Sequence, residues 1–277
     1  MKKKAFKVLA VIISVAFVCV ALVFANAFFG NPVSKALAKS TAQKHLAENY
    51  AGTDYYIEKV GYNFKFSDYY ALIKSPSSAD TVFNLHISPL GKLGYDTFDN
   101  VTNKFTTAQR LETEYRALTD KVLSDEKFPF LSDIAFGTLE IYPKEDIESG
   151  NSDIPAYAIN QSELVLDKVY DINELGKRAG TLVLYIDSDT VTAEKAAEVM
   201  LAIKDIFDAE GVSFAAMDFT LQYPKPEEGM GAEGYIGVEG FPYDEITAER
   251  LAERIAEADK VLREKYEKMD KEAENFS

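Results

Sequence analysis

The chain has 277 residues, with 45 acidic and 30 basic side chains that give a net charge of −15 at pH 7. A surface this negative repels the phosphates of nucleic acid, which disfavours nucleic acid as a partner. The single cysteine, Cys19, lies in an apolar run near the N-terminus. The rest of the chain therefore holds no disulfide framework, no zinc site made of cysteines and no cysteine nucleophile.

The apolar run at the N-terminus predicts a transmembrane helix. Residues 8–29 contain no charged side chain. At about 1.5 Å per residue they extend about 33 Å, enough to cross a hydrocarbon core of about 30 Å. The run follows a cluster of lysines: Lys2, Lys3, Lys4 and Lys7. The positive-inside rule therefore predicts a cytoplasmic N-terminus and an exported remainder of the chain. The lipid bilayer is the predicted partner of residues 8–29.

The same segment has features of a signal peptide that is cleaved after export. Ala25, Asn26 and Ala27 form an A-x-A site of the type that signal peptidase cuts. The apolar core from Val8 to Phe24 has 17 residues, whereas signal peptides have about 7–15, which favours an uncleaved anchor. We predict a single-pass membrane protein, with secretion after cleavage near Ala27 as the alternative.

Residues 32–126 predict a helix, an antiparallel meander and a second helix. Val33, Leu37 and Leu46 recur at helical spacing. Three runs rich in Tyr, Phe, Val and Ile follow, separated by turn residues, and a fourth short strand is expected at 93–98. Apolar residues then recur on one face of a second helix: Leu111, Tyr115, Leu118 and Val122. The proline-containing segment 126–133 predicts the boundary to a second unit.

Residues 127–277 predict an α+β unit with two helices on a mainly antiparallel sheet. The stretches VTAEKAAEVM at 191–200 and ITAERLAERI at 246–255 resemble each other, and each predicts a helix with a threonine N-cap, Thr192 or Thr247. A glycine-led strand precedes each helix. Between them FAAMDFTLQY alternates as expected for a strand, with Ala215, Met217, Phe219, Leu221 and Tyr223 on one face and Ala216, Asp218, Thr220 and Gln222 on the other.

Residues 229–234, GMGAEG, match the letters of the dinucleotide-binding loop G-x-G-x-x-G. That loop binds pyrophosphate only where a strand enters it and a helix leaves it. Here PKPEE precedes the glycines and a predicted strand, YIGVEGF, follows them. The segment therefore indicates a hairpin loop, and we predict no cofactor. The resulting fold class is α+β: an N-terminal transmembrane helix followed by two small antiparallel-sheet-plus-helix domains.

Three stretches occur in an order that resembles a known family. They are SKALAKSTAQKHLAENY after the apolar run, then DYYIEKVGYNFKFSDYYALIKSPSSADTVF, then RAGTLVLYIDSD. This order resembles the YfjL-like proteins of Gram-positive bacteria. The resemblance implies a small, single-pass, surface-exposed protein of an uncharacterised family. It therefore carries over no catalytic or binding residue.

Two candidate sites stand out from the residues themselves. In IDSDTVTAE, Asp187 and Asp189 supply oxygen ligands at the short spacing that suits calcium, although the full calcium loop is absent and a strand end with a helix cap explains them as well. The second candidate is a dense group of aromatic side chains between residues 55 and 70. Because alternation turns some of them outward, we predict a protein-partner surface that includes Tyr55, Tyr56, Tyr69 and Tyr70.

The sequence offers little support for catalysis. His45 and His86 are its only histidines, and neither a G-x-S-x-G elbow nor HExxH is present. The leading hypothesis is therefore a membrane-anchored extracytoplasmic protein that acts as a non-catalytic binding or regulatory module at the cell surface. The alternatives are a carboxylate-dependent hydrolase of the cell envelope, which requires an acid of raised pKa in a cleft, and a calcium-stabilised adhesion module.

Overall fold

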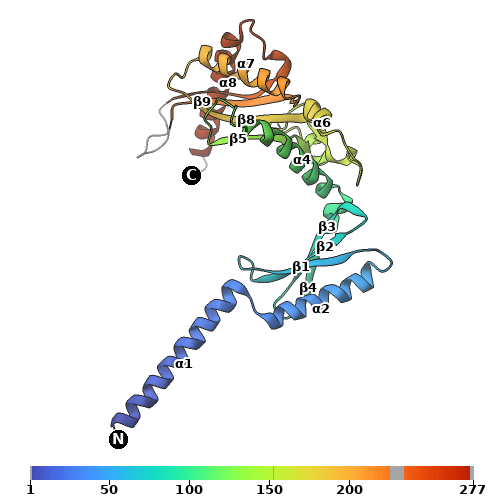
Figure 1. Cartoon of the computed structure of the whole chain (residues 1–277), viewed down its shortest axis with the longest axis vertical. Helices are drawn as coiled ribbons and strands as arrows, with labels where there is room; N and C mark the ends of the chain where they lie inside the picture. The colour runs from blue at the N-terminus through green and yellow to red at the C-terminus, as the bar shows by residue number, and fades with distance from the viewer. Residues whose placement is uncertain (1, 152, 225–233, 275–277) are drawn as a thin grey trace. The chain divides into compact units, whose positions relative to one another are not determined.

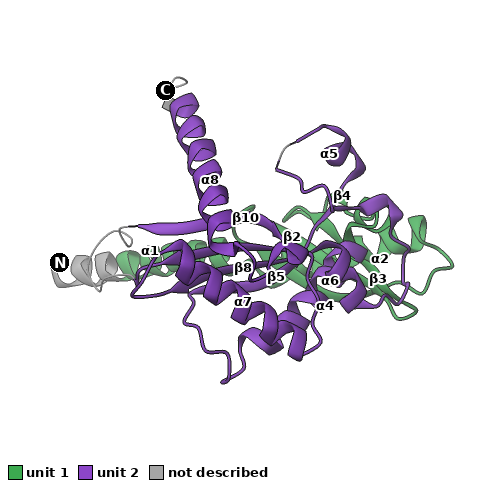
Figure 2. Ribbon diagram, turned by 90° about the horizontal axis from the view of Figure 1, so that it is seen from above, with its two compact units in different colours: residues 1–106 green, residues 107–277 purple. Residues whose placement is uncertain are grey.

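A computed structural model describes residues 2–151, 153–224 and 234–274. The chain divides into two compact units, residues 1–106 (unit 1) and residues 107–277 (unit 2), which Figure 2 shows in separate colours. Each unit has its own sheet and its own buried core.

Unit 1 begins with helix α1 (Lys2–Phe29), which contains the apolar run (Figure 1). A window of 18 residues near the N-terminus has a mean hydropathy of 2.6, and none of it is buried in the protein. By length and composition α1 is suited to cross a membrane. It ends at Phe29, and the next residue, Gly30, has a φ of +68°, which favours glycine. Helix α2 (Pro32–Asn49) follows, with Asn31 as its N-cap.

Unit 1 folds around a four-stranded antiparallel meander, as the sequence predicts. Strands that follow each other along the chain are neighbours in the sheet: β1 (Tyr56–Asn63), β2 (Asp68–Ser75), β3 (Ser78–Ile87) and β4 (Leu93–Asp96). Helix α2 packs on one face of this sheet, where its Ala38 and Ala42 are buried against Ile73, Phe83 and Leu85. A short helix, α3 (Asp99–Thr102), comes after β4.

Unit 2 contains a second four-stranded sheet, in the order β10-β9-β8-β5. These strands are β5 (Ile134–Leu139), β8 (Gly180–Asp187), β9 (Ala216–Gln222) and β10 (Tyr235–Pro242). The two outer pairs are antiparallel, whereas β8 and β9 are parallel because helix α7 (Ala193–Ala209) connects them as a crossover. The sheet is mainly antiparallel, as predicted, with one parallel pair that the sequence did not indicate.

Alternation along β8 and β9 separates the two faces of this sheet. One face is the core, where buried strand residues pack with α7: Leu182, Leu184, Ile186, Met217, Phe219, Leu221, Met200, Ile203 and Phe207. The opposite face of β9 presents the half-buried Asp218, Thr220 and Gln222. The alternation that the sequence showed in this strand therefore gives one apolar and one polar face, and the polar face carries the groove described below.

All but the first two residues of helix α4 (Phe105–Leu123) belong to unit 2, so the units divide before the segment 126–133 where the sequence placed the boundary. The apolar stripe of α4 explains the difference. Its Leu111 and Tyr115 are fully buried in a cluster with Leu139 of β5. The hydroxyl of Tyr115 also donates a hydrogen bond of 3.0 Å to the carbonyl of Ser213.

Several short elements of unit 2 were not predicted. They are the parallel pair β6 (Ile141–Tyr142) and β7 (Ile159–Asn160), the helices α5 (Lys144–Glu148) and α6 (Ile172–Ala179), and the 3-10 turns η1 (Gln161–Glu163) and η2 (Tyr243–Glu245). Strands of two residues are too short to show a period of two, and helical segments of three to eight residues are too short to show a sustained period of 3.6.

The two helix starts that resemble each other in sequence differ in structure. Thr192 caps α7, as predicted, by accepting a hydrogen bond from the backbone N–H of Lys195. Helix α8 (Leu251–Glu274) begins later than predicted, so the N-cap assigned to Thr247 is wrong. Arg250 has a φ of +50°, outside the helical region, and the guanidinium of Arg254 donates to the carbonyl and hydroxyl of Thr247 instead.

Residues 229–233 of the GMGAEG stretch lie outside the described residues. After Gly234 the chain enters β10, so a strand follows the glycines, as predicted.

Candidate functional site

A β-bulge in β10 organises the polar face of the second sheet. Val238 pairs with Phe219 and Phe241 pairs with Met217, so Glu239 and Gly240 both lie opposite Asp218. Gly240 has a φ of +59°, which favours glycine at this position. Its backbone N–H donates a hydrogen bond of 2.6 Å to Oδ1 of Asp218. The bulge therefore brings two carboxylates, those of Asp218 and Glu239, to the same part of the sheet.

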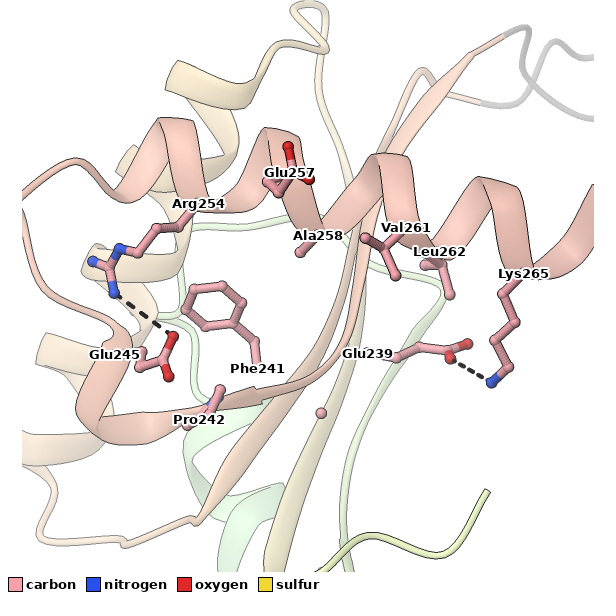
Figure 3. A pocket seen from close by; sticks show the side chains of 11 residues that line it. Glu239, Phe241, Pro242, Glu245, Arg254, Glu257, Ala258, Val261, Leu262 and Lys265 are labelled. Carbon is pink, nitrogen blue, oxygen red and sulfur yellow. Dashed lines mark hydrogen bonds and ion pairs between the residues drawn. The ribbon is translucent and has the colours of Figure 1, made fainter. Parts of the chain in front are cut away.

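An apolar groove of about 500 Å³ runs between the bulged end of β10 and helix α8 (Figure 3). Its apolar lining consists of Phe241, Pro242, Ala258, Val261 and Leu262. Ion pairs mark both ends: Glu239 lies 3.3 Å from Lys265, and Glu245 lies 3.9 Å from Arg254. Figure 3 shows these pairs at opposite ends of the apolar side chains. The groove therefore offers an apolar floor between charged ends.

An acidic groove of about 730 Å³ adjoins the apolar one and shares Glu239, Gly240, Pro242 and Lys265 with it. Its lining comes from four parts of unit 2: β6 with the residues beside it, the loop before β7, the bulge region, and α8. The charged groups in this lining are four carboxylates and one ammonium group: Glu140, Asp153, Asp218, Glu239 and Lys265. The acidic groove therefore attracts cations.

Tyrosine hydroxyls hold several of these groups in place. Tyr142 donates a hydrogen bond of 2.8 Å to Oε2 of Glu140, and Tyr266 donates to Oε1 of Glu239. The hydroxyl of Tyr157 lies 2.9 Å from that of Thr181. Together with the ion pair of Lys265 and Glu239, these contacts fix much of the lining before any ligand arrives.

Burial and neighbouring charges shift several pKa values in the acidic groove. Burial raises the pKa of Asp218, and the negative charges of Glu239 and Glu140 raise it further, while the hydrogen bond from Gly240 and the charge of Lys265 oppose the rise. The hydrogen bond to Glu239, with burial, raises the pKa of Tyr266 to about 12. Burial raises the pKa of Tyr157 to about 12. The hydroxyls of both tyrosines therefore remain protonated at neutral pH.

Helix α8 also protects the free edge of β10, the last strand of the sheet. Oδ1 of Asp259 accepts a hydrogen bond of 2.9 Å from the backbone N–H of Gly237. Arg263 donates to the carbonyl of Tyr235 and forms an ion pair of 2.7 Å with Asp259. These contacts satisfy backbone groups that would otherwise be open to pairing with another strand. They also fix the helix that forms one wall of both grooves.

The predicted calcium ligands lie at the far end of β8. Asp187 is its last residue, and Oδ1 of Asp187 accepts a hydrogen bond of 3.0 Å from Nε2 of Gln222. Asp189 is exposed in the following loop. Within the described part of the chain, no group of three or more His, Cys, Asp or Glu residues is arranged to hold a metal ion. A calcium site at Asp187 and Asp189 stays a prediction from the sequence.

The four tyrosines of the predicted partner surface divide between the two faces of the first sheet. Tyr69 is only 2 % exposed, so it belongs to the core and not to a surface. Tyr55 packs beside that core, against Phe83 and Phe98. Tyr56 is exposed and Tyr70 is half-buried. A partner surface on these strands stays a prediction, and of the four tyrosines only Tyr56 is exposed.

Both histidines pair with carboxylates in unit 1. Nε2 of His45 lies 3.0 Å from Oδ2 of Asp96, which joins helix α2 to strand β4. Nδ1 of His86 lies 3.1 Å from Oδ2 of Asp68, and the His86 ring stacks on Tyr95 with 4.4 Å between ring centroids. These contacts join neighbouring elements of the fold, so they are satisfied structural histidines.

Asp218, Glu239 and Gly240 were not predicted as site residues. The available signal was Gly240, because a glycine inside a strand pattern indicates a bulge or a close backbone approach. The other contributors, such as Glu140 and Tyr157, lie far apart along the chain, and periodicity cannot show that they meet.

The fold defines a class of protein: an α+β protein with an N-terminal helix suited to a membrane and two units that each contain a four-stranded sheet. The family model described as the YfjL-like N-terminal domain matches residues 2–96, and that of the YfjL-like C-terminal domain matches residues 114–256. The chain therefore belongs to the YfjL-like family, as the resemblance indicated. No curated protein and no solved structure was found to match it.

Proposed function

We propose that this YfjL-like protein is a single-pass membrane protein whose two units lie outside the cytoplasm and act as a non-catalytic binding module at the cell surface. Three features support the anchor: the hydropathy of α1, the exposure of its apolar side chains, and the lysines that precede the apolar run. The binding role is carried by one observation, the apolar groove that continues into the acidic groove.

The contacts at the end of α1 favour an uncleaved anchor. Ala27, the last residue of the A-x-A site, lies inside the helix, and its carbonyl accepts a hydrogen bond of 3.0 Å from the hydroxyl of Tyr62. Cleavage after Ala27 would remove the helix that Tyr62 contacts. The alternative is a secreted protein whose mature chain begins at Phe28. Mass spectrometry of the protein from the membrane fraction and from the culture medium distinguishes the two by detecting either peptides from residues 8–27 or a new N-terminus at Phe28.

The charges of the two grooves favour a basic peptide segment as the ligand. The acidic groove has an excess of carboxylates over its single ammonium group, Lys265, while the apolar groove beside it offers a surface for apolar side chains. Asp218 carries a raised pKa because burial and nearby carboxylates disfavour its charge, and a cationic side chain placed beside it relieves that cost. We therefore expect a segment whose apolar side chains contact Phe241 and Leu262 and whose basic side chain contacts Asp218.

Calorimetric titration of the full chain in detergent with peptides that alternate Lys and Leu tests this role. We expect binding that weakens as salt is added and that Asp218→Asn and Glu239→Gln reduce. Glu163→Gln is the matched control, because Glu163 is an exposed acid of the same unit that does not line either groove. Equal binding by all three variants would contradict the proposed site.

A second candidate, the carboxylate-dependent hydrolase, is favoured by one observation. Asp218 has a raised pKa and lies in a groove with Glu239 and Glu140, which is the arrangement that a general acid requires. Incubation of the full chain with cell-wall glycan fragments, followed by mass spectrometry, separates the two functions. Product formation that Asp218→Asn abolishes supports the hydrolase, whereas intact fragments support a binding module without chemistry.

A further inference from the structure

Unit 1 exposes apolar side chains at one end of its sheet. The four in question are large and mostly open to solvent, with exposed fractions of 70 % for Val33, 59 % for Phe64, 75 % for Phe66 and 88 % for Leu90. Folded proteins bury such side chains or use them in contacts, so a group of them indicates an interaction surface.

Strand register places Phe64, Phe66 and Leu90 at the same end of the sheet, and Val33 comes two residues after Asn31, which bonds to Tyr69. Tyr69, near the start of β2, pairs with Ile87, the last residue of β3. The β1–β2 turn, with Phe64 and Phe66, therefore lies at the same end of the strands as the β3–β4 turn, with Leu90. The β3–β4 turn also contacts helix α2, because the hydroxyl of Thr41 donates a hydrogen bond of 2.6 Å to the carbonyl of Gly91.

This end of the sheet is attached to the end of α1. The hydroxyl of Tyr62 donates to the carbonyl of Ala27 at 3.0 Å, and the hydroxyl of Tyr69 accepts a hydrogen bond of 2.7 Å from the backbone N–H of Asn31. Phe64 is two residues beyond Tyr62, a separation of about 7 Å along an extended chain. Figure 1 shows the β1–β2 turn beside the end of α1. The exposed apolar side chains therefore lie close to the point where α1 leaves the membrane.

The local charge at this end is opposite to that of the exported chain. Without the lysines before the apolar run, the net charge of the chain falls from −15 to −19. Yet residues 1–47, 59–67 and 81–95 contain no Asp or Glu, and Asp68, the acid that begins β2 at this end, lies 3.1 Å from Nδ1 of His86. Exposed lysines occur in each of the three segments that form this end: Lys35, Lys65 and Lys92. Lysines near a membrane surface are attracted to the phosphates of anionic lipid headgroups, so the charge of this end suits such a surface.

We propose that this end of unit 1, the interfacial end (Val33, Phe64, Lys65, Phe66 and Leu90), rests in the headgroup region of the same bilayer that α1 spans. The inference depends on the membrane anchor of the proposed function. Apolar side chains at such a surface enter the boundary between headgroups and acyl chains by about 5–10 Å. The lysines then contact headgroup phosphates. The bilayer is the occupant because α1 brings it to this end and because the local charge fits anionic lipid.

Site-directed fluorescence on the full chain tests the interfacial end. In a Cys19→Ala background, Phe64→Cys, Phe66→Cys or Leu90→Cys carries the environment-sensitive dye NBD, and the protein is reconstituted into phosphatidylcholine vesicles with or without phosphatidylglycerol. Pro76→Cys is the matched control, because this exposed residue lies in the β2–β3 turn at the opposite end of the strands. Lipids with a nitroxide near the headgroup serve as quenchers.

We expect blue-shifted emission and nitroxide quenching at positions 64, 66 and 90, stronger with phosphatidylglycerol, and neither effect at position 76. Flotation of the vesicles after alkaline extraction reports the anchor separately. Loss of flotation would overturn the anchor and this inference together. Flotation with unquenched dye at 64, 66 and 90 would overturn the inference alone, and blue-shifted emission without quenching would identify a protein, such as a second copy, as the occupant instead of lipid.

Discussion

The junction between α1 and unit 1 can be tested by adding one methyl group at Gly30. A Cβ at this position would lie 2.5 Å from the hydroxyl oxygen of Tyr69 and 2.8 Å from Cγ of Tyr62. Tyr69 is buried and hydrogen-bonded to Asn31, so it cannot move aside without losing those contacts. Gly30→Ala therefore adds steric overlap to the cost of a positive φ. Gly52→Ala is the matched control, because Gly52 has a φ of +84° and open space around its Cβ position.

The two variants share the backbone cost of about 1–2 kcal/mol for a left-handed residue. Gly30→Ala carries an additional overpacking cost of about 1–3 kcal/mol. Since 1.4 kcal/mol corresponds to about tenfold in an equilibrium constant, amides of β1 and β2 that exchange by opening of unit 1 should exchange about 5- to 150-fold faster in Gly30→Ala than in Gly52→Ala.

Hydrogen–deuterium exchange followed by mass spectrometry of the full chain in detergent measures this difference, with peptides of unit 2 as the internal reference. Equal exchange of β1 and β2 in the two variants would refute the packing of Tyr62 and Tyr69 on Gly30. It would also remove the fixed junction on which the position of the interfacial end depends.

Three further predictions concern unit 2. Because the folded-state pKa of Asp218 is raised, the free energy of unfolding of the wild type should fall as pH rises from the unfolded pKa of about 3.9 to that raised value. Asp218→Asn should lack this fall when unfolding by urea is measured across the same pH range. The same pH dependence of the unfolding free energy in both proteins would contradict the prediction. Phe219→Ala should cost about 3–5 kcal/mol, whereas the exposed Val261→Ala should cost at most about 0.5 kcal/mol; similar unfolding midpoints would contradict the core assignment. Asp259→Ala should accelerate amide exchange at Gly237, and unchanged exchange would show that α8 does not protect that edge.

The sequence predicted the elements whose pattern is long and regular. The apolar run of α1, the first three strands of the meander and the stripe of α4 each extend over eight or more residues, so their type follows from residue composition, turn residues and spacing. The stripe of α4 does not show which sheet the helix covers. The sequence therefore did not show that α4 belongs to unit 2. The start of α8 was missed because its threonine resembles that of α7, while the positive φ of Arg250 has no sequence signature.

The candidate grooves depend on contacts between distant parts of the chain. Asp218 was visible only as a polar residue on the outer face of a strand, and its burial comes from the bulge at Gly240 and from α8. The predicted calcium ligands and partner tyrosines were chosen by local density of residue types. Local density does not report which side of a sheet a residue faces once bulges and turns have set the register.

The central claim is that α1 anchors the chain with both units outside the cytoplasm, and cysteine accessibility in intact cells tests it most directly. In a Cys19→Ala background, Lys4→Cys lies before the apolar run, whereas Lys127→Cys and Lys271→Cys are exposed positions of unit 2. A membrane-impermeant maleimide should label positions 127 and 271 in intact cells and position 4 only after lysis. Labelling of position 4 in intact cells, with protection of positions 127 and 271, would contradict the claim.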